Sequence, residues 1–297
     1  MTVGITPDTS NENPYVTVAE YRNAPTALNI DMLVVGGNAA AQDAELAQVI
    51  LRASSYMNEY FNQNLVADEY TETQRIRFSN SGGYFALHPY NAPIVSLSSF
   101  YYGSNPNQLY ALGDCSTAWF EGQQIIIPGN QIGWYATSQG PLQFGGSMGQ
   151  SNWTFTKYTY VAGYVNTTMI TTTNAGATSL TVDDPTGIIA GQHYRIYDGA
   201  RSERVTVSTN YTYGNPVVTF VNPMIFAHGA GAAFGNLPNA LKQACILITS
   251  AFIKMRGDSS TTMAYTTSPS GNVAGSTRYG GDIQVALDMV NKFRRIR

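Results

Sequence analysis

Three amphipathic helix patterns lie near the two ends of this chain. Between the first and the second, apolar residues recur at a different spacing over a long region. In residues 38–61, 238–255 and 282–297, apolar side chains recur at steps of three and four, as on one face of a helix. Between residues 75 and 164 the period falls to two, which is the period of a strand. Helices kept apart from a run of strands predict an α+β fold, with a helical core and a β-rich body.

Residues 173–235 predict a further, smaller β module. Four short alternating runs follow one another there, separated by turn-forming groups such as Asp183-Asp184-Pro185 and Asp198-Gly199. We therefore expect a discontinuous core, made of residues 1–172 and 236–297. The module would be inserted into that core as a small sandwich or barrel-like unit.

The helix predicted for residues 238–255 is apolar on nearly all sides. Leu241, Ile248 and Phe252 form one stripe, and Ile246 and Leu247 make the opposite side apolar as well. A helix of this kind is buried centrally or sandwiched between subunits. We assign Leu241, Ile248 and Phe252 to a subunit interface.

The last predicted helix combines an apolar face with a cationic end. Val290 and Phe293 belong to the face, and the cations that follow are Lys292, Arg294, Arg295 and Arg297. Cations suit the carboxyl end of a helix, where backbone carbonyls are unpaired. They could equally contact DNA phosphates or an acidic partner surface. The polar stretch before this helix, residues 256–281, predicts a long loop.

Charge is scarce in this chain. Charged residues make up 12% of the 297 residues, about half the ~25% of an average soluble chain. Lys and Arg number 16 against 19 Asp and Glu, a formal net charge of −3. This balance argues against tight nucleic-acid binding. A surface of tyrosine and uncharged polar groups favours contact with other proteins, although an ordinary β-rich protein also collects tyrosine and threonine.

No motif in the sequence predicts catalysis, a cofactor or a metal. The histidines, His88, His193 and His228, lack the spacing of metal ligands, and no nucleophile elbow or phosphate loop occurs. The pair Asp183-Asp184 could contribute to a calcium site, but a simple turn explains it better. The two cysteines lie far apart, which argues against a disulfide framework. No apolar stretch reaches the ~18 residues of a membrane span.

Several phrases resemble the head-tail connector, or adaptor, proteins of long-tailed bacteriophages, which bind beneath the portal ring. They occur in the order known from that family: Val16-Thr17-Val18-Ala19-Glu20-Tyr21, the helix from Ala41 to Phe61, Leu87-His88-Pro89-Tyr90-Asn91-Ala92-Pro93-Ile94, Tyr158-Thr159-Tyr160-Val161-Ala162-Gly163-Tyr164, and the helix at Pro238. The resemblance covers about residues 15–170 and 236–297. The module at 173–235 departs from the smallest, mostly helical members.

The resemblance implies a virion protein of the head-tail neck, made in the host cytoplasm. It would form a ring with copies of itself, commonly twelve, between the portal protein and a stopper or tail-completion protein. Double-stranded DNA would pass through the lumen without sequence-specific binding. The cationic end, with Val290 and Phe293, would contact the portal. Deletion of residues 281–297 would then abolish docking and leave the subunit folded.

Two alternatives remain. A carbohydrate-binding or tail-fibre-like β protein would use the clustered aromatic residues Trp153, Phe155, Tyr158 and Tyr160 to stack on sugar rings. An enzyme of unknown type would need a pocket that joins a histidine to two carboxylates. Tryptophan fluorescence quenched by oligosaccharides would favour the sugar-binding alternative, and ring formation without a response to sugar would favour the connector.

Overall fold

The computed structural model describes residues 13–30, 33–79, 84–128, 153–255 and 280–295. The chain divides into two compact units. Residues 67–163 form the first unit. The second unit combines the described residues from 13 to 66 with those from 164 to 295. The predicted boundaries at 172/173 and 235/236 stay a prediction.

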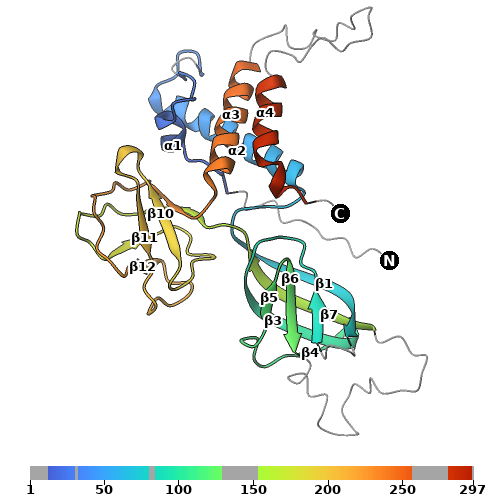
Figure 1. Ribbon diagram of the computed structural model, residues 1–297. Coiled ribbons are helices and arrows are strands. Elements are labelled where there is room, and N and C mark those ends of the chain that lie inside the picture. The colour runs from blue at the N-terminus through green and yellow to red at the C-terminus, as the bar shows by residue number, and fades with distance from the viewer. Residues whose placement is uncertain (1–12, 31–32, 80–83, 129–152, 256–279, 296–297) are drawn as a thin grey trace, which may run out of the picture. The chain divides into compact units, whose positions relative to one another are not determined.

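The first unit is one antiparallel sheet of seven strands (Figure 1). The strands are β1 (Asp68–Ser79), β2 (Tyr84–Leu87), β3 (Ile94–Asn105), β4 (Gln108–Ala111), β5 (Trp119–Glu121), β6 (Gln124–Pro128) and β7 (Trp153–Ala162). Their order in the sheet is β4-β3-β7-β1-β2-β6-β5. In a flat sheet β3 and β6 would lie about 19 Å apart, yet they contact each other. The sheet is therefore strongly curled around its own core.

The core of this unit is aromatic and aliphatic, as the alternating pattern predicts. Its buried members include Phe85, Leu87, Phe100, Ile125, Ile127, Tyr158 and Tyr160. Alternate residues of a strand point to the same face, so the two tyrosines of β7 lie side by side, with ring centroids 5.6 Å apart. Both tyrosines bring hydroxyl groups into the core, and those groups need acceptors.

Glu72 supplies the acceptors. Its carboxylate is buried and accepts hydrogen bonds from the hydroxyls of Tyr158 and Tyr160 and from the backbone N–H of Tyr90, at 2.9, 2.5 and 2.7 Å. Burial, together with the nearby charge of Glu72, raises the pKa of Tyr160 well above its usual range. One carboxylate thus accepts hydrogen bonds from two tyrosine hydroxyls of β7 and from one backbone N–H in the loop before β3.

We expect Glu72→Gln to destabilise the first unit by about 1–3 kcal/mol, because the amide replaces one acceptor oxygen with a donor that faces a hydroxyl donor. Urea unfolding followed by tyrosine fluorescence measures this change. Thr73→Val, an exposed substitution on the same strand, is the control and should change stability by less than ~0.5 kcal/mol. Equal stability of the two variants would show that the carboxylate is not required.

The helices of the second unit confirm most of the predicted helix positions. They are α1 (Val18–Asn23), α2 (Ala39–Phe61), α3 (Asn239–Met255) and α4 (Gly280–Val290), followed by a short 3-10 turn, η5 (Asn291–Phe293). Asn38 caps α2, accepting a hydrogen bond from the backbone N–H of Ala41 at 2.9 Å. The last helix differs from its prediction, because it ends at Val290 and the chain then turns until the N–H of Arg295 reaches the carbonyl of Phe61.

The helices share one apolar core, in which α3 contacts both α2 and α4. Its buried members include Leu46, Ile50, Met57, Phe61, Leu241, Cys245, Ile248, Ala286, Leu287 and Val290. Since α4 contributes three of these side chains, removal of residues 281–297 would expose the core. The structure therefore argues against the expectation that such a deletion leaves the subunit folded.

The rest of the second unit is built from short strands, which we call the β module. They are β8 (Asn166–Thr168), β9 (Ser179–Thr181), β10 (His193–Tyr197), β11 (Glu203–Thr206), β12 (Val217–Thr219) and β13 (Ala233–Gly235). Four of them form a sheet in the order β11-β10-β13-β8, and β12 pairs with β9. Gly235 is required on β13, because a Cβ there would lie 2.0 Å from the carbonyl oxygen of Val165.

Candidate functional site

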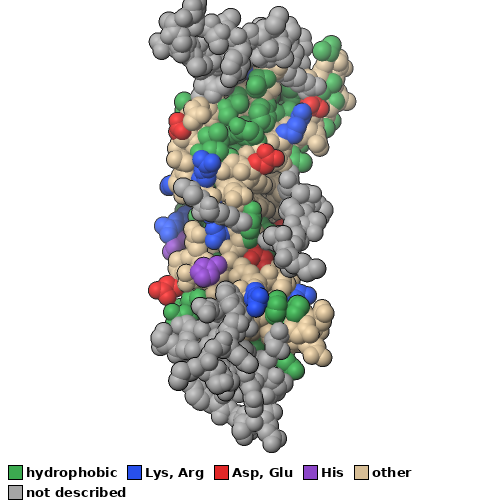
Figure 2. All heavy atoms as spheres, turned by 90° about the vertical axis from the view of Figure 1, so that its right-hand side faces the viewer, with side chains coloured by type: hydrophobic (Ala, Val, Ile, Leu, Met, Phe, Trp, Pro, Cys, Tyr) green, Lys and Arg blue, Asp and Glu red, His purple; other side chains and the backbone are tan. Residues whose placement is uncertain are grey.

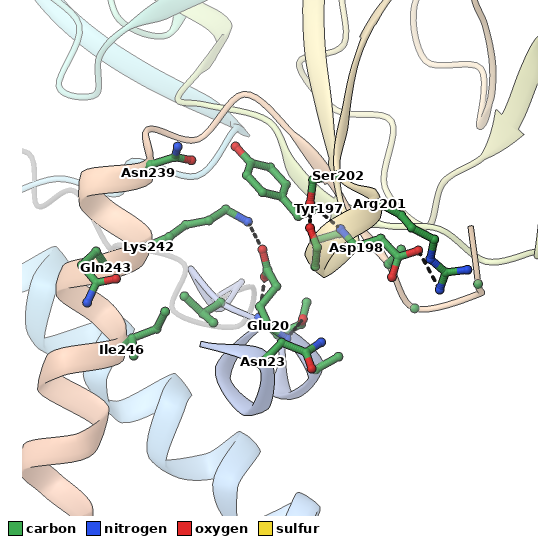
Figure 3. A pocket seen from close by; sticks show the side chains of 18 of the residues that line it. Glu20, Asn23, Tyr197, Asp198, Arg201, Ser202, Asn239, Lys242, Gln243 and Ile246 are labelled. Carbon is green, nitrogen blue, oxygen red and sulfur yellow. Dashed lines mark hydrogen bonds and ion pairs between the residues drawn. The ribbon is translucent and has the colours of Figure 1, made fainter. Parts of the chain in front are cut away.

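A pocket of about 420 Å³ lies in the second unit, between α1, α3 and two segments of the β module (Figure 3). One segment is Tyr197–Ser202, which includes the short 3-10 turn η3 (Gly199–Arg201), and the other is Gly229–Ala233. We call it the Lys242 pocket, after the cation on its α3 wall. Its volume falls in the range of ligand-binding cavities.

Lys242 is buried and has two partners, one from each side of the pocket. Its ammonium is paired with the carboxylate of Glu20 on α1 and lies 3.9 Å from the ring centroid of Tyr197 on β10. Burial lowers the pKa of Lys242, and the charge of Glu20 opposes that shift. Burial also raises the pKa of Tyr197, and its hydroxyl donates to the carbonyl of Leu237 at 3.1 Å. The cation therefore joins α1, α3 and the β module.

The side chain of Glu20 is also held in place by hydrogen bonds at the start of α1. The side chain of Thr17 accepts from the N–H of Glu20, and the N–H of Thr17 donates to Glu20 Oε2 at 2.9 Å, which makes a capping box at the start of α1. The other carboxylate oxygen is left for Lys242. The residues that line the pocket include no histidine or cysteine, and Lys242 is held as an ion pair.

A second charge network begins at His228, the residue before the Gly229–Ala233 wall, and includes Asp198 of the other wall. The imidazole of His228 is fully buried, with Nδ1 3.1 Å from Asp198 Oδ2 and Nε2 2.8 Å from Glu203 Oε1. Both ring nitrogens therefore lie within hydrogen-bond distance of a carboxylate oxygen. Glu203 also accepts from the backbone N–H groups of Ile225 and Phe226, at 2.8 and 3.1 Å.

This network makes the β module sensitive to acid. Burial opposes the ionisation of Glu203, but hydrogen bonds from Ile225, His228 and Phe226 outweigh it and hold the pKa of Glu203 below its usual value. A carboxyl group with a lowered pKa in the folded state stabilises that state above its unfolded pKa and loses this contribution as pH falls through the folded value.

We therefore expect amide exchange at Ile225 and Phe226 to accelerate relative to the sheet amides as pH is lowered below ~4, once the intrinsic pH dependence of exchange is removed. Hydrogen exchange by NMR measures it. Glu203→Gln should show the faster exchange already at neutral pH. Unchanged protection in that variant would contradict the role of the carboxylate.

The other residues considered as metal ligands, His88, His193 and Asp184, have hydrogen-bond partners within the protein. His88 Nε2 lies 3.0 Å from the side-chain amide of Gln124, and His193 Nδ1 lies 2.8 Å from the hydroxyl of Thr206. Asp184 accepts from the N–H of Thr186, as in a simple turn. Among the residues that the structure describes, no group of three or more His, Cys, Asp or Glu could hold a metal ion. Both cysteines are free.

The predicted interface residues differ in how much surface they leave. Leu241 and Ile248 are fully buried in the helical core of their own subunit. Phe252 is partly exposed and packs edge to face with Tyr56, at 5.9 Å between ring centroids. Their assignment to a subunit interface stays a prediction, and only Phe252 keeps surface for it.

The predicted portal contact lies around η5. Val290 is buried in the core, and Phe293 packs against Phe61 and Tyr164. The ammonium of Lys292 and the guanidinium of Arg294 lie 5.0 and 5.1 Å from the ring centroids of Phe293 and Tyr60. Arg295 is only partly exposed, and Arg297 lies outside the described residues. A role in portal contact stays a prediction for all six.

Helix α4 carries a second apolar stripe that faces away from the core. Val285 and Met289 are 57% and 43% exposed, and residues four apart lie on one side of a helix. We call these two side chains the α4 face. Figure 2 shows hydrophobic side chains gathered over the helical part of the molecule, and Tyr56 and Met255 are exposed on the neighbouring helices.

The aromatic residues considered for sugar binding differ in how far they are buried. Tyr158 and Tyr160 are fully buried. Phe155 is partly buried, with the guanidinium of Arg75 5.5 Å from its ring centroid. The side chain of Trp153 lies outside the described residues. Trp119 and Phe120 on β5 are instead exposed, at 45% and 43%.

No helix in the described ranges combines the length and the hydropathy that a membrane crossing requires.

Comparison with known proteins gives one structural match. No family model and no curated protein matches the chain. The chain is similar to one from a structure described as "Neck of empty GTA particle computed with C6 symmetry", over 96% of this chain and 95% of that chain, with 13% sequence identity and a TM-score of 0.36. A TM-score this low does not establish a common fold.

Proposed function

We propose that the chain is a structural subunit of a phage-like neck, a head-tail connector that forms a ring against the portal. The observation that carries this proposal is the α4 face. It places two bare hydrophobic side chains at adjacent turns on the outside of a helix whose other side fills the core. Exposed apolar surface of this kind marks protein contacts, and the residues that resemble connector proteins supply the kind of assembly.

Within this proposal, the α4 face meets a neighbouring copy, together with Phe252, Tyr56 and Met255. The cations Lys292 and Arg294 contact the portal at the edge of this surface, and Val290 and Phe293 hold them in place by packing on the core. The opposite side of the ring contacts a stopper or tail-completion protein. DNA passes through the lumen without being bound tightly, because a chain with a net charge of −3 does not attract phosphates overall.

Co-sedimentation with rings of the portal protein from the same particle tests this function. We expect the chain to sediment with the portal at a fixed ratio, and the bound fraction to fall as salt rises because cations take part. A chain that stays in the supernatant at every salt concentration would contradict the proposal. A chain that is monomeric in the absence of portal would not contradict the proposal, because binding to the portal can drive ring assembly by mass action.

A second candidate, carbohydrate binding, is favoured by one observation. Trp119 and Phe120 are neighbours on an edge strand and point to opposite faces, yet both are nearly half exposed. Exposed aromatic rings can stack on sugars. Quenching of the protein's fluorescence by oligosaccharides that disappears in Trp119→Phe would support this function. The absence of quenching would leave the connector as the remaining candidate function.

A further inference from the structure

The adjacent strands β10 and β11 of the β module (Figure 1) carry cations on their outer side. In the register of these antiparallel strands, Arg195 lies opposite Arg204, and His193 lies opposite Thr206. Residues directly opposite each other point to the same side of a sheet, with Cβ atoms about 5 Å apart. Both arginines and His193 are exposed, and His193 Nδ1 lies 2.8 Å from the hydroxyl of Thr206. We call these four side chains the arginine face.

The charges of this hairpin are separated by side. The carboxylates of Glu203 and Asp198 contact the buried imidazole of His228, whereas Arg195 and Arg204 point outward. Among the described residues, neither of these two arginines forms an ion pair with a carboxylate. Like charges directly opposite each other destabilise a pair of strands, so folding alone does not favour this arrangement. Local rules of this kind are broken mostly at functional sites, and a bound anion would remove the repulsion.

The chemistry of the arginine face favours phosphate groups over a protein surface. In the described ranges, none of the exposed large hydrophobic side chains lies on β10 or β11. A protein interface has an apolar core inside a polar rim, whereas an interface with DNA is more polar and more positively charged. Guanidinium, imidazole and hydroxyl groups donate hydrogen bonds to phosphate oxygens, and one guanidinium can donate two in parallel. The net charge of −3 does not prevent a local contact, because salt screens charges beyond about 10 Å.

We propose that the arginine face binds the phosphate backbone of duplex DNA, weakly and without reading its sequence. Arg201, in the turn between the two strands, is 57% exposed and adds a third cation, although it also pairs with Asp198 at 3.3 Å. So few phosphate contacts release few counterions, which keeps the affinity low and lets the DNA move. In a ring of copies the weak contacts would act together. This inference goes beyond the proposed function and takes from it only the presence of DNA at the neck.

Fluorescence anisotropy of a labelled duplex of about 20 base pairs, measured as NaCl rises from about 10 to 150 mM, tests the contact. Three neutralised phosphates predict that log K falls with log salt at a slope of roughly −2.7. Arg195→Gln with Arg204→Gln should reduce the magnitude of that slope by roughly 2. This variant should stay folded by circular dichroism, because it removes a repulsion. The matched control, Arg22→Gln with Arg52→Gln, removes two exposed arginines from α1 and α2 and should keep the full slope.

A slope that becomes shallower in the arginine face variant and not in the control supports the inference. Equal slopes in the two variants, or no binding at the lowest salt, overturn it. Poly-glutamate that binds the chain more tightly than the duplex would also overturn it and would assign the face to an acidic protein partner. A chain that does not bind DNA but sediments with the portal removes this inference alone. A chain that binds DNA and stays in the supernatant with the portal removes the proposed function and leaves the arginine face as a DNA contact.

Discussion

Lys242→Ala is expected to cost about 3–5 kcal/mol of folding free energy, because it leaves the carboxylate of Glu20 in a buried position without its counter-charge. The side chains of Lys242 and Glu20 are only 8% and 12% exposed, so water cannot replace the lost partner fully. The substitution also removes the cation that stacks on Tyr197. Chemical denaturation with circular dichroism measures the loss.

Two further variants separate charge from packing. Lys254→Ala removes an ion pair with Asp282 whose side chains are 34% and 44% exposed, and such a pair contributes at most ~1 kcal/mol. The double variant Lys242→Met with Glu20→Gln removes both charges and should recover much of the stability, since apolar replacement of a buried pair is often close to neutral. If Lys242→Ala cost no more than Lys254→Ala, the buried pair would not stabilise the fold.

Val285→Asp with Met289→Asp is expected to weaken assembly on the portal at least a hundredfold and to leave the subunit folded. Both side chains are exposed in the single chain, so the monomer loses little. In a ring each would be buried, and burial of one such side chain contributes about 1.5–3 kcal/mol, which is roughly tenfold or more in affinity per residue. Light scattering with the portal present gives the assembly midpoint.

The matched control places the same charges on another helix. Ala44 and Gln48 are exposed on α2 and are also four residues apart, so Ala44→Asp with Gln48→Asp adds equal charge away from the α4 face. We expect this control to assemble like the unchanged chain. Equal weakening in both double variants would mean that the effect comes from charge alone and would remove the α4 face from the interface.

The sequence predicted helices, strands and helix caps correctly where they depend on residues close together in the chain. Asn38 was identified as a helix cap, and the structure confirms it. The predicted α+β fold is also confirmed. The C-terminal helix was predicted too long, because its apolar face continues to Phe293 although the backbone has already turned after Val290. The second stripe of α4 was missed, yet its signal was present, since Val285 and Met289 are four residues apart.

The pocket could not be predicted from spacing. Glu20 and Lys242 are 222 positions apart, and only the fold brings them together. The same holds for His228, whose partners are two carboxylates on another part of the β module. A histidine beside two carboxylates was expected only for an enzyme pocket; His228 has two carboxylate partners, but its side chain is fully buried and does not line the Lys242 pocket. A buried imidazole between two carboxylates has no fixed spacing along the chain.

Electron microscopy of the chain mixed with portal rings tests the central claim most directly. Images of portal alone, of portal with the chain, and of portal with the α4 face variant would be compared. The connector account predicts an extra ring stacked coaxially on one face of the portal, with an open lumen, and its loss in the variant. Portal rings that look the same with and without the chain would contradict it.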